Sequence, residues 1–244
     1  MSWEEATWQA PKGVRAGTTT RLGGVSRGVF AGFNLGAHVG DEAACVRANR
    51  AELRRELDLP SEPFWLTQVH GVAVAAYTAD QDAPVADAAV SFLPDQVLAV
   101  LTADCLPVVF ASVDGERLGI AHAGWRGLAA GVLEATATAL GPVPLVAWLG
   151  PAIGAMAFEV GEEVRDVFVQ TDAQATHAFV MNARGRWQAD LVALARRRLA
   201  ALGIPVTGGA SCTLTDAHRF YSYRRDGQTG RLATLVWRRS SPQG

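Results

Sequence analysis

The sequence has little lysine and cysteine and almost no net charge. Lys12 is its one lysine, so chemistry that requires a lysine has a single candidate. The cysteines Cys45, Cys105 and Cys212 are odd in number and far apart, which excludes a disulfide framework and suits a reducing cytoplasm. The formal net charge of −2 gives no general attraction to nucleic acid or anionic lipid, so we expect neither as a partner.

Long apolar runs are also missing. No uncharged apolar stretch approaches the length of about 20 residues that a membrane span needs, and residues 1–13 lack the basic and apolar regions of a signal peptide. We therefore expect a cytoplasmic protein without a membrane partner. The sequence sets no oligomeric state, and we expect a monomer. With 49% hydrophobic and 19% charged residues, the 244-residue chain can bury a sizeable core.

Helix and strand patterns follow one another without a repeat or a long linker. Residues 41–59 form the clearest amphipathic helix, with Asp41 as the expected cap, and further helices are expected over 124–140, 159–169 and 188–202. Strand patterns cover residues 13–20, 64–69, 72–77, 97–102, 107–112, 117–121, 145–150 and 231–237. Because several strands follow each other directly, the order favours an α+β fold with mixed sheets, and we expect a single domain over 1–244.

Three strand patterns end in a potential metal ligand. His70 lies in TQVHG, Cys105 in LTADCLPVV and His122 in GIAHAGWRG. These spacings are too long for a zinc finger, so the fold would have to assemble any site. Two interpretations stay open at this point. One is a zinc ion with three protein ligands and an open fourth position. The other is a Cys105 thiolate nucleophile with His122 as its base.

The stretch HAGWRG, residues 122–127, adds glycines to this pattern. Gly124 and Gly127 let the backbone pass close to a ligand, and Arg126 offers a bidentate contact to phosphate. The free N–H groups at the start of the helix expected over 124–140 also favour an anion. The alternative is that Trp125 packs this helix onto the sheet and Arg126 lies in solvent.

The motifs TTRLGGVS, FNLGAHVGD, TQVHG, TADCLPVV, HAGWRGLAAGVLE, LGPAIG and FYSYRRDG occur in this order between about residues 14 and 237. Together they resemble the bacterial laccase-domain family, also described as purine nucleoside phosphorylase-like or as peptidoglycan editing factor. The resemblance implies an α/β/β/α layered sandwich. It also implies a zinc ion on His70, Cys105 and His122, which would be the catalytic group.

The implied reaction is phosphorolysis of purine nucleosides. Adenosine, inosine, guanosine or methylthioadenosine would react with phosphate to give the base and ribose 1-phosphate, with adenosine deamination as a further activity. Family-matching positions expected to contact substrate are Arg21, Asn34, Arg50, Gln68 and Arg126. Arginines suit phosphate, and the two amides suit ribose hydroxyls or base edges.

Further positions are candidates for the same site. Asp104 and Asp87 are the candidate proton-shuttling carboxylates for deamination. The late segment FYSYRRDG could close the site through Tyr221, Arg224 or Arg225.

Other functions stay open on the sequence alone. A cysteine hydrolase or amidase acting in peptidoglycan precursor editing would use Cys105 and His122. A copper polyphenol oxidase is less favoured, because five histidines are too few for the four coppers of a multicopper oxidase. A single copper on two histidines and Cys105, with Met156 or Met181 as a weak axial ligand, is compatible with the ligand chemistry. A module that binds a nucleotide without catalysis is the remaining alternative.

Overall fold

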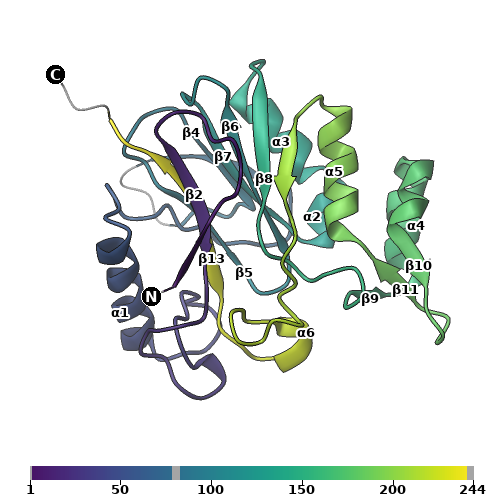
Figure 1. Ribbon diagram of the computed structural model, residues 1–244, viewed down its shortest axis with the longest axis horizontal. Coiled ribbons are helices and arrows are strands. Elements are labelled where there is room, and N and C mark those ends of the chain that lie inside the picture. Colours follow the sequence, from purple (N-terminus) through teal and green to yellow (C-terminus); the bar gives the residue numbers. More distant parts are fainter. Residues whose placement is uncertain (1, 79–82, 241–244) are drawn as a thin grey trace.

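The computed structural model of the protein describes residues 2–78 and 83–240. Its smaller main sheet has the order β1-β2-β13-β5, with all neighbours antiparallel. The strands are β1 (Trp3–Glu5), β2 (Val14–Thr19), β5 (Leu98–Thr102) and β13 (Leu232–Arg238). The last strand of the chain therefore lies in the middle of this sheet, between β2 and β5 (Figure 1).

The larger sheet has six strands in the order β12-β8-β6-β7-β4-β3. They are β3 (Val74–Ala76), β4 (Ala88–Ser91), β6 (Leu106–Ser112), β7 (Leu118–Ala123), β8 (Leu145–Leu149) and β12 (Val206–Gly208). The two edge strands run parallel to their neighbours and the inner pairs are antiparallel. The sheet is thus mixed, as the strand order along the sequence predicts.

Strand β6 shows how the two sheets pack. All seven of its residues are buried, so it has no polar face. Val109 and Ala111 join the core between the two sheets, whereas Val108 and Phe110 join the core beneath the helices. Alternate side chains of one strand point to opposite faces, so this strand contributes to both apolar layers.

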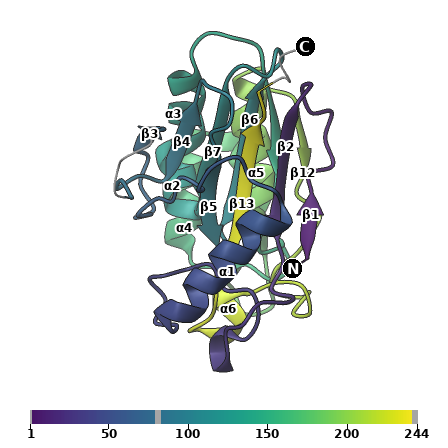
Figure 2. The same ribbon diagram turned by 90° about the vertical axis from the view of Figure 1, so that its left-hand side faces the viewer.

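Helices cover the outer faces of both sheets. Helix α1 (Ala43–Glu56) places Leu53 against Leu235 and Trp237 of the four-stranded sheet, and Figure 2 shows it in front of this sheet. The six-stranded sheet is covered by α2 (Trp125–Ala130), α3 (Val132–Leu140) and α5 (Leu191–Ala201). The predicted α/β/β/α sandwich with mixed sheets is confirmed.

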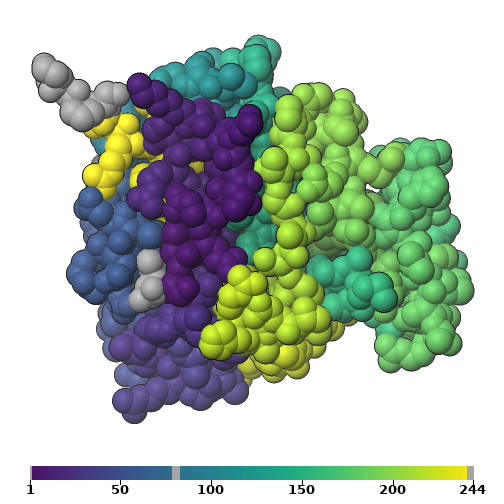
Figure 3. Space-filling model, viewed as in Figure 1, coloured from purple at the N-terminus to yellow at the C-terminus, as the bar shows by residue number. Residues whose placement is uncertain are grey.

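A small third sheet extends the molecule beside α5. It has the order β10-β11-β9 and comprises β9 (Glu159–Val160), β10 (Phe179–Met181) and β11 (Trp187–Ala189). With α4 (Glu162–Thr171) it forms the lobe at the right of the space-filling view (Figure 3). A short helix, α6 (Tyr223–Asp226), precedes β13. In the described residues, no helix combines the length and apolarity that crossing a membrane requires.

Several predicted elements differ from the structure. The helix expected over 124–140 is two helices, because Gly131 adopts the left-handed conformation (φ 102°) that ends α2. The first of them has only six residues. Its helix dipole is therefore weak, and this removes most of the physical basis for the anion site expected at its start. Asp41 does not cap α1. Glu42 holds that position, and Asp41 instead accepts hydrogen bonds from Ser26 and Asn34.

The strand expected over 64–69 is wrong. Only isolated bridges form there, between Phe64 and Leu98 and between Thr67 and Val85. The reason lies in Gln68, whose side-chain amide donates to the carbonyl of Leu101 and accepts from its N–H. This side chain therefore occupies the edge of β5 that a pairing strand would need.

Candidate metal centre

Three distant segments bring His70, Cys105 and His122 together. His122 lies near the end of β7, Cys105 lies in the tight turn between β5 and β6, and His70 lies in the loop before β3. One ligand atom from each residue lies within 4.8 Å of the other two. Cys105 Sγ is 3.8 Å from His70 Nε2, and the two imidazole rings are nearly perpendicular with centroids 4.7 Å apart. The fold thus assembles the trio that the sequence indicates.

Two residues of these loops adopt an unusual backbone conformation. His70 has φ 62° and Asp104 has φ 98°, a region that residues other than glycine enter only when neighbouring contacts hold them. The Asp104 carboxylate accepts hydrogen bonds from Thr213 Oγ1 at 2.6 Å and from the N–H of Arg224 at 2.7 Å. These contacts fix the turn that presents Cys105.

Asp87 holds both histidines in place, as Asp104 holds the turn of Cys105. It is fully buried. Its carboxylate accepts Nδ1–H of His122 at 2.8 Å and the backbone N–H groups of Val69, His70 and Gly71 at 3.1, 2.9 and 2.7 Å. With Nδ1 held in this way, Nε2 of His122 is the nitrogen available to the cluster. Asp87 therefore positions the candidate ligands, and it does not line the cavity beside them.

Gly124 makes room for the cluster. Its φ is −60°, which any residue can adopt, so conformational freedom is not the reason for glycine here. A Cβ at this position would lie 2.9 Å from Cδ2 of His70 and 3.1 Å from Sγ of Cys105. A Cβ at Gly127 would lie 2.8 Å from the carbonyl oxygen of Gly71. The glycines of HAGWRG are thus explained by the close approach of the loops that carry His70 and Cys105.

The electrostatics of the trio favour a thiolate. Burial raises the pKa of Cys105, but the charge and hydrogen bonds of His122 and His70 outweigh it and lower the pKa to about 6. Burial lowers the pKa of His122, but the Cys105 thiolate and the Asp87 carboxylate raise it to about 9. A deprotonated sulfur beside two imidazoles is the form that binds a metal ion.

This donor set fits zinc. One thiolate and two imidazoles are ligands that zinc accepts, and three protein ligands leave the fourth tetrahedral position open. The carboxylate behind His122 matches the outer hydrogen bond that metal-bound histidines usually make. Within the described ranges the trio is the one group of three potential metal ligands. Met156 and Met181 are exposed and do not line the cavity beside it, so the structure assembles no axial methionine for a blue copper centre.

The trio lies in the wall of a cavity of about 480 Å³. Aromatic and apolar side chains line much of it, with a smaller number of polar groups. The other lining residues are His38, Gln68, Leu101, Thr102, Ala103, Asp104, Trp125, Arg126, Ile153, Phe158, Leu191, Tyr223, Arg224 and Arg231. This volume and this lining are typical of a small-molecule site.

Two of the five expected substrate contacts line this cavity. Arg126 is exposed, and its guanidinium lies 4.4 Å from the centre of the Trp125 ring. Gln68 also lines the cavity, but its amide is bonded to Leu101 of β5.

The other three lie outside the cavity lining. Arg21 lies over the Tyr221 ring at 4.7 Å. Asn34 is fully buried, where it bonds Gly36, Asp41 and the N–H of Arg231. Arg50 donates to the carbonyl of Leu35 and stacks on Trp65. The structure thus brings Gln68 and Arg126 to the metal centre and uses these three within the surrounding loops.

Of the three residues expected to close the site from the segment FYSYRRDG, one lines the cavity and two do not. Arg224 lines the cavity and its Nη1 donates to the carbonyl of Glu159. Tyr221 is fully buried, with its hydroxyl donating to carbonyls of the 28–31 turn, and Arg225 bonds backbone carbonyls and Asp226. These two do not line the cavity.

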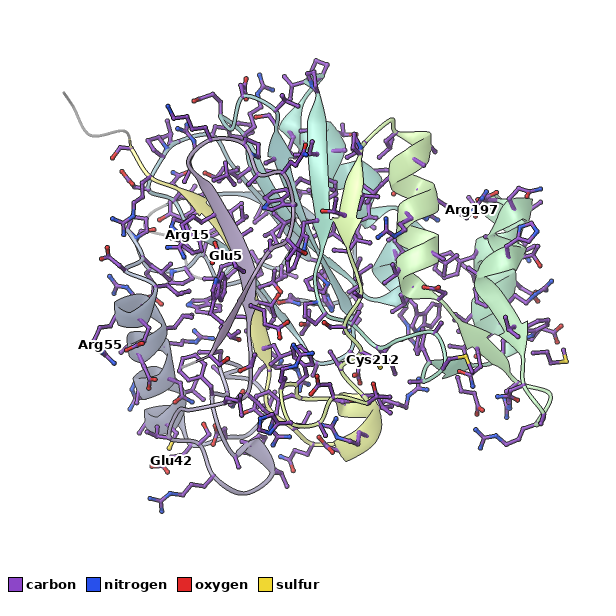
Figure 4. The ribbon with its side chains drawn as sticks, in the orientation of Figure 1. Glu5, Arg15, Glu42, Arg55, Arg197 and Cys212 are labelled. Atoms are coloured by element: carbon purple, nitrogen blue, oxygen red, sulfur yellow. The ribbon has the colours of Figure 1, made fainter. Side chains whose placement is uncertain are left out.

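The remaining cysteines lie apart from the trio. Cys212, labelled in Figure 4, accepts a hydrogen bond from the N–H of Gly154 at 3.2 Å. Cys45 lies on α1, 3.7 Å from a carboxylate oxygen of Glu42. Neither lines the cavity.

The sequence does not predict several cavity residues, among them His38, Tyr223 and Arg231. His38 lies in FNLGAHVG, Tyr223 lies in FYSYRRDG, and Arg231 begins the predicted last strand. For Tyr223 the available signal is the density of polar and aromatic residues before that strand, and His38 and Arg231 lie outside this stretch. The sequence offers no means of telling which of them face inward.

Comparison with known proteins is consistent with this geometry. Residues 15–239 match the protein family described as multi-copper polyphenol oxidoreductase laccase. The chain is 53% identical to a purine nucleoside phosphorylase of Pseudomonas aeruginosa, over 97% of this chain and 98% of that protein. It is 49% identical to purine nucleoside phosphorylase YfiH of Escherichia coli, over 94% and 96% of the two chains.

Solved structures show the same fold. The Neisseria meningitidis protein NMB0706 superposes with a TM-score of 0.93 at 44% identity, over 98% of this chain and all of that one. YlmD from Geobacillus stearothermophilus gives a TM-score of 0.91 at 30% identity, over 98% and 97%. The chain belongs to the laccase-domain family, and the resemblance found in its motifs is confirmed.

Proposed function

We propose that this protein is a zinc-dependent purine nucleoside phosphorylase. The observation that carries the proposal is the trio of His70, Cys105 and His122 in the wall of a cavity large enough for a nucleoside. Two relatives that match nearly the whole chain, at 53% and 49% identity, bear the name purine nucleoside phosphorylase. The proposed substrates are adenosine, inosine, guanosine or methylthioadenosine, together with phosphate.

In this reaction a phosphate oxygen forms a bond to C1′ of the ribose while the bond from C1′ to the purine nitrogen breaks. The purine leaves with the electron pair and takes up a proton. His70, Cys105 and His122 would hold the zinc ion, which supplies a Lewis acid that offsets negative charge on an oxygen. Trp125, Phe158 and Tyr223 line the cavity and offer aromatic surfaces for the purine. Asp87 keeps His122 in one tautomer throughout.

Adenosine deamination is the second proposed activity, and it needs a carboxylate that reaches the substrate. Asp104 lines the cavity, whereas Asp87 does not. We assign the proton shuttle to Asp104. An Asp104→Asn variant should lose inosine formation from adenosine. Its zinc content is measured alongside, because Asp104 also holds the turn that presents Cys105, and loss of inosine formation at the wild-type zinc content is the result that supports the assignment. Unchanged deamination in this variant would refute the assignment.

The phosphorolysis test measures adenine released from adenosine with and without phosphate. The zinc-loaded protein should release adenine only when phosphate is present, a chelator should stop the reaction, and added zinc should restore it. Cys105→Ala should abolish both zinc binding and turnover. Cys212→Ala is the matched control, because that cysteine does not line the cavity. Activity that survives complete metal removal would overturn the zinc role.

A cysteine hydrolase or amidase acting in peptidoglycan precursor editing is a second candidate, and one observation favours it. Cys105, His122 and Asp87 are arranged as a nucleophile, a base and a carboxylate that orients the base. Burial raises the pKa of Cys105, but the charges and hydrogen bonds of His122 and His70 outweigh it and lower this pKa to about 6. This function predicts turnover of an amide that alkylation stops and a chelator does not. Turnover that disappears on chelation would exclude it.

A further inference from the structure

The arginines that line the cavity share one property. Arg126, Arg224 and Arg231 have no carboxylate in ion-pair contact among residues 2–78 and 83–240. Eleven other arginines do pair with aspartate or glutamate, among them Arg198 with Glu134 at 2.7 Å. The cavity therefore holds three arginines that form no ion pair with a carboxylate of the described residues.

Arg231 differs from the other two because it is partly buried, whereas Arg126 and Arg224 are exposed. Its Nη1 donates to the carbonyls of Thr229 and Gly230 at 2.9 and 3.1 Å. Its side chain passes directly over Gly36, where an added Cβ would lie 2.7 Å from Cγ of Arg231. The guanidinium is thus held in place by one of its nitrogens.

The other donors of Arg231 remain available. Nε and Nη2 donate no hydrogen bond to any residue that the structure describes. Burial lowers the pKa of Arg231, while the negative charges of Cys105 and Asp104 raise it, and a guanidinium stays charged at every physiological pH. A charge partly removed from water costs free energy unless an opposite charge meets it. No carboxylate of the described residues lies in ion-pair contact with Arg231, and an anionic ligand in the cavity would supply that contact.

His38 lines the same cavity as Arg231. Its pKa is lowered by burial and then by the positive charges of Arg231 and Arg50. It is consequently a neutral imidazole at neutral pH, with one N–H to donate, close enough to Arg231 to sense its charge. A planar cation and a neutral donor that line the same cavity match the oxygens of a tetrahedral anion.

We propose that Arg231 and His38 form a subsite for a phosphate group within the cavity that holds His70, Cys105 and His122. The inference deepens the proposed function, since phosphorolysis would supply inorganic phosphate to this subsite. A phosphate ester carried by a purine nucleotide is the other source of the same chemistry. Arg126 and Arg224 are less suited, because one stacks on Trp125 and the other bonds the carbonyl of Glu159 at the exposed rim.

The test is calorimetric titration of the zinc-loaded protein with inorganic phosphate, with adenosine and with adenosine monophosphate. Arg231→Gln should weaken phosphate binding by about tenfold or more, because it removes charge-assisted hydrogen bonds. Adenosine, which carries no phosphate, should bind this variant within about twofold of the wild type, a difference too small for the loss of one hydrogen bond. Arg196→Gln is the matched control. That arginine also bonds backbone carbonyls, those of Val206 and Gly208, and does not line the cavity.

His38→Gln provides a second route if Arg231→Gln does not fold, since His38 is more exposed than Arg231. It should weaken phosphate binding by about threefold to tenfold, as expected for one hydrogen bond. Wild-type phosphate affinity in both variants would overturn the subsite.

The titrations also separate the two sources of phosphate. If only adenosine monophosphate binding depends on Arg231, the subsite stands and holds the phosphate of the substrate itself. If inorganic phosphate binds through Arg231 but no adenine forms from adenosine, the subsite stands and the proposed phosphorolysis fails.

Discussion

Asp87 Oδ1 accepts Nδ1–H of His122 at 2.8 Å and the backbone N–H of His70 at 2.9 Å, so one carboxylate holds two of the three candidate metal ligands. Burial raises the pKa of Asp87, but hydrogen bonds from His122 and from backbone N–H groups outweigh it and keep the pKa below its ordinary value. The carboxylate is therefore ionised at neutral pH and acts as an acceptor for both segments.

Replacing this carboxylate should weaken zinc binding. Asp87→Asn retains the shape but loses the charge, and its amide can no longer accept at both positions. We expect the zinc affinity to fall roughly 10- to 100-fold, as for other residues behind metal-bound histidines. Competition with a chromophoric chelator measures the change. Asp114→Asn, in the exposed turn before β7, is the control and should bind zinc as the wild type does. Equal affinities in the two variants would show that Asp87 does not position the ligands.

Gly124 should resist even the smallest side chain. The Cβ of Gly124→Ala would press on His70 and Cys105, a kind of overpacking that costs about 1–3 kcal/mol. Loss of zinc affinity is the expected readout. Gly71→Ala is a matched control within the same site, because its Cβ would make only ordinary contacts, at 3.5 Å to Asp87 and 3.6 Å to Val69. If both variants lose zinc equally, steric room at Gly124 is not the explanation.

Alkylation should distinguish the cysteines of the metal-free protein. Despite burial, His122 and His70 lower the pKa of Cys105 to about 6, so its thiolate is present above about pH 6 and is lost below it. Burial and Glu42 raise the pKa of Cys45, which should remain a slowly reacting thiol at pH 7. Mass spectrometry of iodoacetamide-treated protein across pH measures both rates. The Cys105 rate should be half-maximal near pH 6 and level off about one to two pH units above it, and zinc should suppress it. A Cys105 profile that follows Cys45 would contradict this environment.

A variant of Asn34 tests whether this residue contacts the substrate or stabilises the fold. Its buried amide joins Gly36, Asp41 and Arg231, so Asn34→Ala leaves several polar groups without partners. We expect the free energy of unfolding in urea to fall by about 2 kcal/mol or more. Asn182→Ala, in the turn between β10 and β11, should cost less. A variant that unfolds like the wild type but shows a raised KM for nucleoside would instead establish the predicted substrate contact.

The sequence predicts the strands that form the centre of both sheets but not the small ones. Runs such as 107–112 and 231–237 are long and apolar, and they appear as β6 and β13. The run AAVS that forms β4 is short and made of small residues, so no periodicity marks it. The three strands beside α4 have two or three residues each and depend on tertiary pairing.

Some residues of the candidate site are likewise predictable from the sequence, and others are not. The candidate metal-binding trio is predictable because each of its residues lies in a distinctive motif, although the strand expected before His70 does not form. The part played by Asp87 is not, because it depends on the His70 loop crossing the start of β4. The position of Arg231 is not predictable either, because only the completed fold shows that it lines the cavity.

The central place of β13 affects how the protein can be synthesised. This strand leaves the ribosome after all the others, yet it separates β2 from β5. Until it is inserted, those two strands present unpaired edges, which are templates for aggregation. Arg231 directly precedes it, so during synthesis this cation reaches the cavity only after the other described strands have been made. A nascent chain released before residue 232 would therefore carry the metal-ligating residues on an incomplete sheet.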